Sequence, residues 1–258
     1  MKKKKWLILF PVPLKFFKKK WLFWFSITLN ILFVLASLLL LPQKGATFYL
    51  LSNTELSQIA NTRNGTVKFS NYYLDRKSLF DILPASKNAV IFLGDSLTNR
   101  CEWSELFGNQ NIKNRGINGD NTYAILKRLD QITNLQPRKI FIMIGINDLI
   151  AKEKTDNIIY KYRLILRGIN QSIPGTQVFV QSILPVNNRL KLIADNNEII
   201  ALNNKIRSLA EEFKYKYIDL YPTFSTNNQL TELYTNDGIH LNGIGYLTWK
   251  QALIEYVD

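Results

Sequence analysis

The sequence has very few residues that bind metals or form disulfides. It has one cysteine, Cys101, and one histidine, His240, among 258 residues. A single cysteine cannot form an internal disulfide, which excludes a disulfide-stapled scaffold. A metal site built from histidine and cysteine is almost excluded by the same counts. The chain is 47% hydrophobic and 21% charged, so it can bury a core and is neither disordered nor fibrous.

Acidic residues are absent from the start of the chain. The first one is Glu55, whereas residues 1–44 contain nine lysines. The remaining residues, 45–258, therefore carry only +4 of the net charge of +13. A nearly balanced main body is not typical of a surface that follows a phosphate backbone, so we expect no nucleic-acid partner.

Charged residues are also missing from residues 21–41, which read WLFWFSITLNILFVLASLLLL. At about 1.5 Å per residue, a helix of this length spans roughly the hydrocarbon core of a bilayer. Trp21 and Trp24 lie at the lysine-flanked end, as expected at a membrane interface. The run predicts one transmembrane helix. The main alternative is a cleaved signal peptide, but its apolar region is usually shorter and ends at a small-residue site that is not clear here.

The lysines around this run indicate its orientation. Lys15, Lys18, Lys19 and Lys20 precede it and only Lys44 follows closely. Because positive residues stay in the cytoplasm, we expect residues 1–20 to form a basic cytoplasmic N-terminus and the main domain to lie outside the cytoplasm.

The rest of the chain alternates between short apolar runs and helical periods. This pattern predicts an α/β domain over residues 88–258 with a parallel sheet covered on both faces. Residues 42–87 are interpreted as a stalk and a domain-entry segment with a helix that packs beside the domain. The predicted strands are residues 89–93, 112–115, 139–144, 177–183 and 217–220, and the predicted helices include residues 122–132 and 243–256. Asp156 and Asp195 are candidate helix caps.

Ser96 lies in the sequence Gly94-Asp95-Ser96, directly after the first predicted strand. A turn from strand to helix exposes the serine hydroxyl, and a backbone N–H at the helix start can stabilise an oxyanion. The alternative is that Asp95, Ser96 or Thr98 only caps the helix.

His240 follows Asp237 by three residues, just before the last predicted helix. Asp237 can accept the proton of one ring nitrogen, which leaves the other nitrogen free to accept a proton from a serine. The alternative is that Asp237 and Gly238 only form a turn. A mechanism that pairs serine with histidine must use His240, because the chain has no other histidine.

Two further loops follow predicted strands and contain glycine and asparagine. The first contains Gly116 and Gly119, and the second contains Asn147. A glycine N–H and an asparagine amide can both donate to a developing oxyanion, although both residue types are also common in ordinary turns.

Together these four blocks resemble the SGNH (GDSL) hydrolase family over residues 88–258. The block with Gly116 and Gly119 and the segment from Asp237 to Tyr246 are similar to its acetylhydrolase branch. The resemblance implies a flavodoxin-like three-layer α/β/α sandwich with about five parallel strands. It implies catalytic residues Ser96, Asp237 and His240, and oxyanion donors from the Ser96 N–H, Gly119 and Asn147. Gly116 is the alternative to Gly119.

The resemblance implies a membrane-anchored serine esterase that forms an acyl-enzyme and needs no metal or organic cofactor. The expected substrate is a small acyl or acetyl ester on a carbohydrate or lipid. Two alternatives stay open: an O-acyltransferase with the same acyl-enzyme, and a catalytically inert glycan-binding module.

Overall fold

The computed structural model describes residues 69–84, 86, 88–189 and 193–257. The predicted transmembrane helix, residues 21–41, lies outside the described residues, as do the cytoplasmic N-terminus and most of the stalk. Within the described part of the chain, no helix has both the length and the hydrophobicity needed to cross a membrane.

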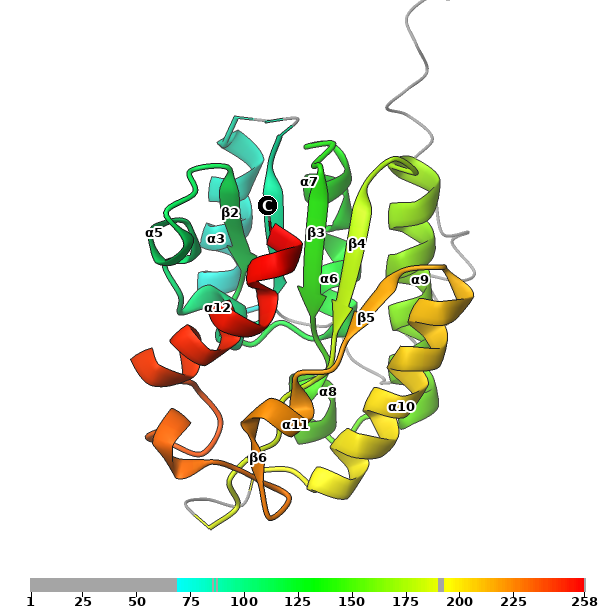
Figure 1. Ribbon diagram of the computed structural model, residues 1–258. Helices are drawn as coiled ribbons and strands as arrows, with labels where there is room; N and C mark the ends of the chain where they lie inside the picture. Colours follow the sequence, from blue (N-terminus) through cyan, green and yellow to red (C-terminus); the bar gives the residue numbers. More distant parts are fainter. Residues whose placement is uncertain (1–68, 85, 87, 190–192, 258) are drawn as a thin grey trace, which may run out of the picture. The chain divides into compact units, whose positions relative to one another are not determined.

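The described residues form a five-stranded parallel sheet with helices on both faces (Figure 1). The strand order is β2-β1-β3-β4-β5, which is the flavodoxin-like order. The strands are β1 (Val90–Gly94), β2 (Ile112–Gly116), β3 (Lys139–Met143), β4 (Gln177–Gln181) and β5 (Lys216–Ile218). This confirms the predicted α/β fold with five parallel strands.

The helices of the described residues differ in length, from four residues to 18. They are α3 (Asn71–Ile82), α4 (Ser96–Asn99), α5 (Trp103–Phe107), α6 (Thr122–Lys127), α7 (Leu129–Thr133), α8 (Ile146–Ile150), α9 (Thr155–Ser172), α10 (Asn196–Glu212), α11 (Tyr221–Phe224) and α12 (Gly243–Val257). A 3-10 turn, η1 (Glu232–Tyr234), and a small hairpin, β6 (Ser225–Thr226) and β7 (Gln229–Leu230), precede α12. The helix α3 lies in the predicted domain-entry segment.

Alternating side chains of each strand serve two separate cores. In β1, Ile91 and Leu93 belong to the core formed with α9 and α10, whereas Val90 and Phe92 pack with Trp103 and α12. This division follows from the two-residue period of a strand, whose neighbouring side chains point to opposite faces. The two apolar cores hold the middle layer rigidly between its helices.

The strands β4 and β5 each end two residues earlier than predicted, because side chains accept hydrogen bonds from the backbone N–H groups that follow them. After β4, the N–H of Ile183 donates to Asn203 Oδ1 at 2.8 Å. After β5, the N–H groups of Leu220 and Tyr221 donate to Ser182 Oγ at 2.8 and 2.9 Å. These bonds replace the ladder bonds that a longer strand needs.

The predicted helix 122–132 is wrong as one element, because α6 and α7 are separated at Arg128, whose φ is −126° and ψ is 18°. The predicted cap at Asp195 is confirmed, since its side chain accepts from the N–H of Asn197 at 2.8 Å. The predicted cap at Asp156 is wrong. The helix α9 starts at Thr155, after the N-cap Lys154, so the cap lies two residues earlier than predicted and Asp156 lies within the first turn.

Candidate active site

Ser96 is the first residue of α4 and follows the end of β1 directly. Asp95 caps this short helix, because its Oδ1 accepts a hydrogen bond from the N–H of Leu97 at 2.9 Å. The capping interpretation is therefore correct for Asp95. This cap does not use the Ser96 hydroxyl, which is free to bond a residue from another part of the chain.

His240 and Asp237 lie in the loop between η1 and α12. The Oδ2 atom of Asp237 lies 2.6 Å from His240 Nδ1. The Oδ1 atom of Asp237 accepts hydrogen bonds from the N–H groups of Ile239 and His240, at 3.0 and 2.8 Å. The carboxylate therefore fixes both the loop backbone and the imidazole ring.

The structure brings the serine and the histidine together across 144 residues of sequence. The Nε2 atom of His240 lies 2.9 Å from Ser96 Oγ. A second bond braces the same junction, since the hydroxyl of Tyr246 in α12 donates to the carbonyl of Leu97 at 2.8 Å. Ser96, His240 and Asp237 thus form one continuous hydrogen-bonded chain.

The environment of Asp237 keeps it ionised. Partial burial acts to raise its pKa, but the hydrogen bonds from the His240 side chain and from the N–H groups of His240 and Ile239 outweigh burial and lower the pKa to about 2. An ionised Asp237 accepts the proton on Nδ1, which leaves the lone pair of Nε2 pointing at the serine hydroxyl.

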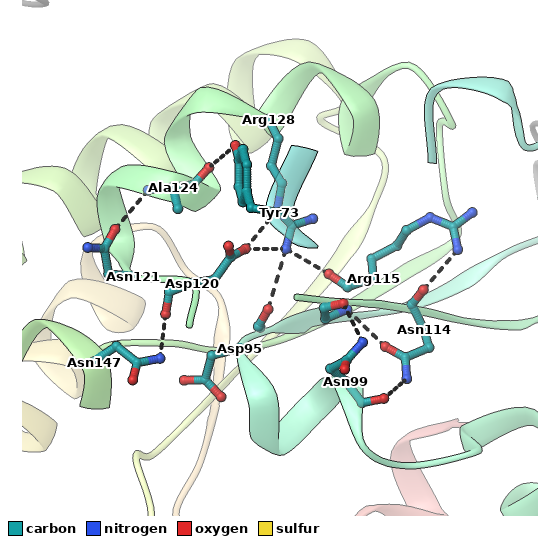
Figure 2. A network of polar contacts seen from close by, with 12 residues as sticks. Tyr73, Asp95, Asn99, Asn114, Arg115, Asp120, Asn121, Ala124, Arg128 and Asn147 are labelled. Carbon is teal, nitrogen blue, oxygen red and sulfur yellow. Dashed lines mark hydrogen bonds and ion pairs between the residues drawn. The ribbon is translucent and has the colours of Figure 1, made fainter. Parts of the chain in front are cut away.

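Asn147 lies in α8, directly after β3, and its amide is held by the neighbouring loop. Its Nδ2 donates to the carbonyl of Asp120 at 2.8 Å, as Figure 2 shows. An amide nitrogen has two hydrogens, so the second one remains for a ligand. The loops that follow β1, β2 and β3 therefore meet at this edge, where parallel α/β sheets bind their ligands.

Gly116, the last residue of β2, and Gly119, in the loop that follows, have different reasons to be glycine. A Cβ on Gly116 would lie 2.4 Å from the backbone nitrogen of Asn99 and 2.9 Å from the carbonyl of Asp95. A Cβ on Gly119 would meet no atom within 4 Å, but Gly119 has a φ of +82°, which residues with side chains rarely adopt. Gly116 is thus packed against the turn that carries Ser96, whereas Gly119 is set by its backbone conformation.

Three buried carboxyl groups surround these loops. Burial raises the pKa of Asp95 to about 7 and that of Asp120 to about 6, although Arg128 acts to lower the latter. Burial also raises the pKa of Asp148, against the hydrogen bonds from Thr122. Asp148 accepts from the N–H and the hydroxyl of Thr122 at 2.9 and 2.6 Å, which ties α8 to the start of α6.

Analysis of the sequence missed Arg128 and Asp120, which form a buried ion pair with an Nη2–Oδ2 distance of 2.7 Å. The local sequence does not mark this pair, because Arg128 follows Lys127 and stands close to Asp130, and Asp120 precedes Arg128 by eight residues. In the described ranges, no group of three or more histidine, cysteine or acidic residues is arranged to hold a metal ion.

The chain belongs to the GDSL-like lipase/acylhydrolase family, whose model matches residues 92–247. That match covers all four loops described above, from the end of β1 to the middle of α12. The protein is therefore a carboxylic ester hydrolase of the GDSL type.

Among curated proteins, the chain is similar to the platelet-activating factor acetylhydrolase IB subunit alpha1 of Homo sapiens. The two are 28% identical over 174 residues, which cover 64% of this chain and 73% of the relative.

Solved structures share the fold. A GDSL-like lipase from Bacteroides thetaiotaomicron has a TM-score of 0.63 at 23% identity and covers 72% of this chain and 96% of its own. A lipase/acylhydrolase from Enterococcus faecalis has a TM-score of 0.59 at 17% identity, with coverage of 66% and 95%.

Proposed function

We propose that the protein hydrolyses a short acyl ester, with Ser96 as nucleophile, His240 as general base and Asp237 as the group that orients His240. The observation that carries this proposal is the hydrogen-bonded chain, 2.9 Å from Ser96 Oγ to His240 Nε2 and 2.6 Å from His240 Nδ1 to Asp237 Oδ2. These distances suit proton transfer along a serine–histidine–aspartate triad.

In the proposed reaction, Ser96 Oγ attacks the ester carbonyl carbon while its proton passes to His240 Nε2. The resulting imidazolium is stabilised by Asp237, whose low pKa keeps it a carboxylate. The same proton then passes to the leaving alcohol, which leaves an acyl-enzyme. A water molecule then gives a proton to His240 as it attacks the acyl carbon. When the bond between the acyl carbon and Ser96 Oγ breaks, His240 returns a proton to Ser96 Oγ and the acid is released.

The oxyanion of each tetrahedral intermediate needs hydrogen-bond donors. We assign this role to the N–H of Ser96, the N–H of Gly119 and the amide of Asn147. Gly119 is favoured over Gly116 because the N–H of Gly116 already donates to Asn114 Oδ1 at 2.9 Å. Loss of one such donor typically lowers kcat by about 10² to 10³.

The substrate is proposed to be a small acyl group, such as acetyl, on a carbohydrate or lipid outside the cytoplasm. The similarity to an acetylhydrolase over 64% of the chain supports the short acyl group. The uncharged run at residues 21–41 and the lysines before it support an outward-facing domain on a membrane anchor.

Hydrolysis of p-nitrophenyl esters from acetyl to dodecanoyl by the full chain tests the proposal. We expect the acetyl and butyryl esters to be cleaved fastest and Ser96→Ala to reduce kcat by at least about 10³. Ser208→Ala removes an exposed hydroxyl on α10 and should change nothing.

Two results would contradict the proposal. Full activity in Ser96→Ala would exclude Ser96 as the nucleophile, and a preference for dodecanoyl would exclude the short acyl substrate. Turnover only after addition of a sugar acceptor would indicate an acyltransferase instead of a hydrolase.

A further inference from the structure

The Asp120 carboxylate lies in the turn that also contains Gly119, and it is almost fully buried. Its Oδ2 accepts a hydrogen bond from Arg128 Nε at 2.8 Å and forms an ion pair with Arg128 Nη2 at 2.7 Å. The Oδ1 atom has no partner among the described residues. In that part of the chain, Arg128 is thus the side chain that holds this carboxylate.

Arg128 also binds the ends of the two strands that enter the site. Its Nη2 donates to the carbonyl of Arg115 in β2 at 2.8 Å and lies 3.4 Å from the carbonyl of Gly94 in β1. Figure 2 shows the guanidinium of Arg128 at the centre of these contacts, with Asp120 between it and Asn147. One fully buried cation therefore links the end of β1, the end of β2 and the turn after β2.

The backbone of Asp120 also holds the Asn147 side chain. Its carbonyl accepts the hydrogen bond from Asn147 Nδ2 that sets the direction of that amide. Movement of the Asp120 turn would therefore move both the Gly119 N–H and the Asn147 amide, although the two lie in different loops.

The helix α3 closes this cluster. The ring of Phe80, which is 4% exposed, lies 4.8 Å from the Arg115 guanidinium and 6.0 Å from that of Arg128. The hydroxyl of Tyr73 donates to the carbonyl of Ala124 in α6 at 3.3 Å. These contacts exclude water from the ion pair, which strengthens its electrostatic attraction.

We infer that Arg128 is a positioning residue for ester hydrolysis: through the Asp120 turn it places the Gly119 N–H and the Asn147 amide together as oxyanion donors. This inference rests on the proposed function, because it assigns those donors a role in that reaction. Arg128 itself touches no reacting atom.

Enzyme kinetics on the full chain test this inference with a mutant cycle. We expect Arg128→Gln to lower kcat at least about tenfold while KM stays within about threefold, because donors that act in the transition state are displaced. Arg128→Lys keeps a charge beside Asp120 and should recover part of kcat. If Arg128→Gln does not fold, the kinetics of Arg128→Lys are compared with the wild type instead.

The second arm of the cycle is Asn147→Ala. If Arg128 acts through the donors, Arg128→Gln should cost clearly less in the Asn147→Ala background than in the wild type, because one of its targets is already gone. The inference would be overturned if the fold-loss of kcat in the double variant equalled the product of the losses in the two single variants. A wild-type kcat in folded Arg128→Gln would overturn it as well. Ile206→Val, which shortens a fully buried side chain of α10, is the control for general loosening.

Hydrogen exchange by mass spectrometry gives a readout that needs no turnover. Peptides that span residues 116–122 should exchange faster in Arg128→Gln than in the wild type, and Ile206→Val should not show this change. If the wild type cleaves no ester, the proposed function fails, and unchanged exchange at 116–122 would separately overturn the role of Arg128.

Discussion

Asp95 is a carboxyl group with almost no contact with water, directly before Ser96. One oxygen caps α4 through the N–H of Leu97, and the other has no partner within the described ranges. Burial raises its pKa to about 7. A folded state that holds this proton more tightly than the unfolded chain loses stability as pH rises, from the ordinary aspartate pKa near 4 up to about 7.

Asp95→Asn should therefore flatten the pH dependence of stability. Asparagine keeps an oxygen for the cap and carries no charge at any pH. We expect the free energy of unfolding of Asp95→Asn, relative to the wild type, to rise by about 1 kcal/mol or more between pH 5 and pH 8. Urea unfolding at the two pH values measures this difference.

Asp195→Asn is the matched control for that experiment. Asp195 caps α10 by the same side-chain bond but is exposed, so its replacement should shift stability equally at both pH values. If the difference in unfolding free energy between Asp95→Asn and the wild type were also the same at pH 5 and pH 8, Asp95 would be ionised in the folded protein at neutral pH.

Gly116, at the end of β2, and Gly119, in the loop that follows, give a second test. Gly116→Ala forces a Cβ against backbone atoms of the Ser96 turn, which cannot move freely, and should cost about 3 kcal/mol of stability or prevent folding. In Gly119→Ala the added Cβ meets no atom within 4 Å, but the residue must keep a positive φ. The loss of stability should be about 1 to 2 kcal/mol. Thermal unfolding compares them, and equal losses would contradict the distinction.

Ser96, His240 and Asp237 could be chosen from the sequence as candidates, because each lies in a short motif, and the structure places the three in hydrogen-bonding contact. Arg128 could not be assigned in the same way. Its partners are a carboxylate eight residues away and two backbone carbonyls on neighbouring strands, and carbonyls leave no trace in residue identity.

The helix α12 connects the histidine side of the site to the sheet. Trp249 Nε1 donates to the buried Gln181 side chain of β4 at 2.7 Å, and the Trp249 ring packs edge-on against Trp103 at 5.0 Å. The sequence predicted a helix over residues 243–256, which is α12, but not the polar bond between Trp249 and Gln181. The ends of β4 and β5 were mispredicted because they depend on distant side chains.

Tyr246→Phe tests the bond between α12 and α4. It removes the donor to the Leu97 carbonyl, next to Ser96, and should cost about 1 kcal/mol of stability together with a several-fold loss of kcat. Denaturant unfolding and p-nitrophenyl acetate kinetics measure the two effects. Tyr160→Phe on the exposed side of α9 is the control. A loss of stability without loss of kcat would mean that the bond does not align Ser96.

The uneven charge of the whole chain predicts where the protein resides. We expect the full chain to sediment with membranes and to resist extraction at alkaline pH, as an uncleaved span would. Deletion of residues 1–44 should release it, and a protease added from outside should digest the domain but not the lysines at residues 2–20. A mature protein that starts after residue 41 would instead indicate a cleaved signal peptide.

The whole site is assembled from two parts that differ in how far apart their residues are in sequence. Asp237 and His240 are three residues apart and meet within one loop, whereas Ser96 reaches them across 144 residues. Partial opening that detaches α12 would separate the serine from an otherwise intact histidine–aspartate pair while the sheet stays folded. Esterase activity should then disappear at a lower denaturant concentration than β-sheet structure. The loss of activity would measure the stability with which α12 is attached to the domain.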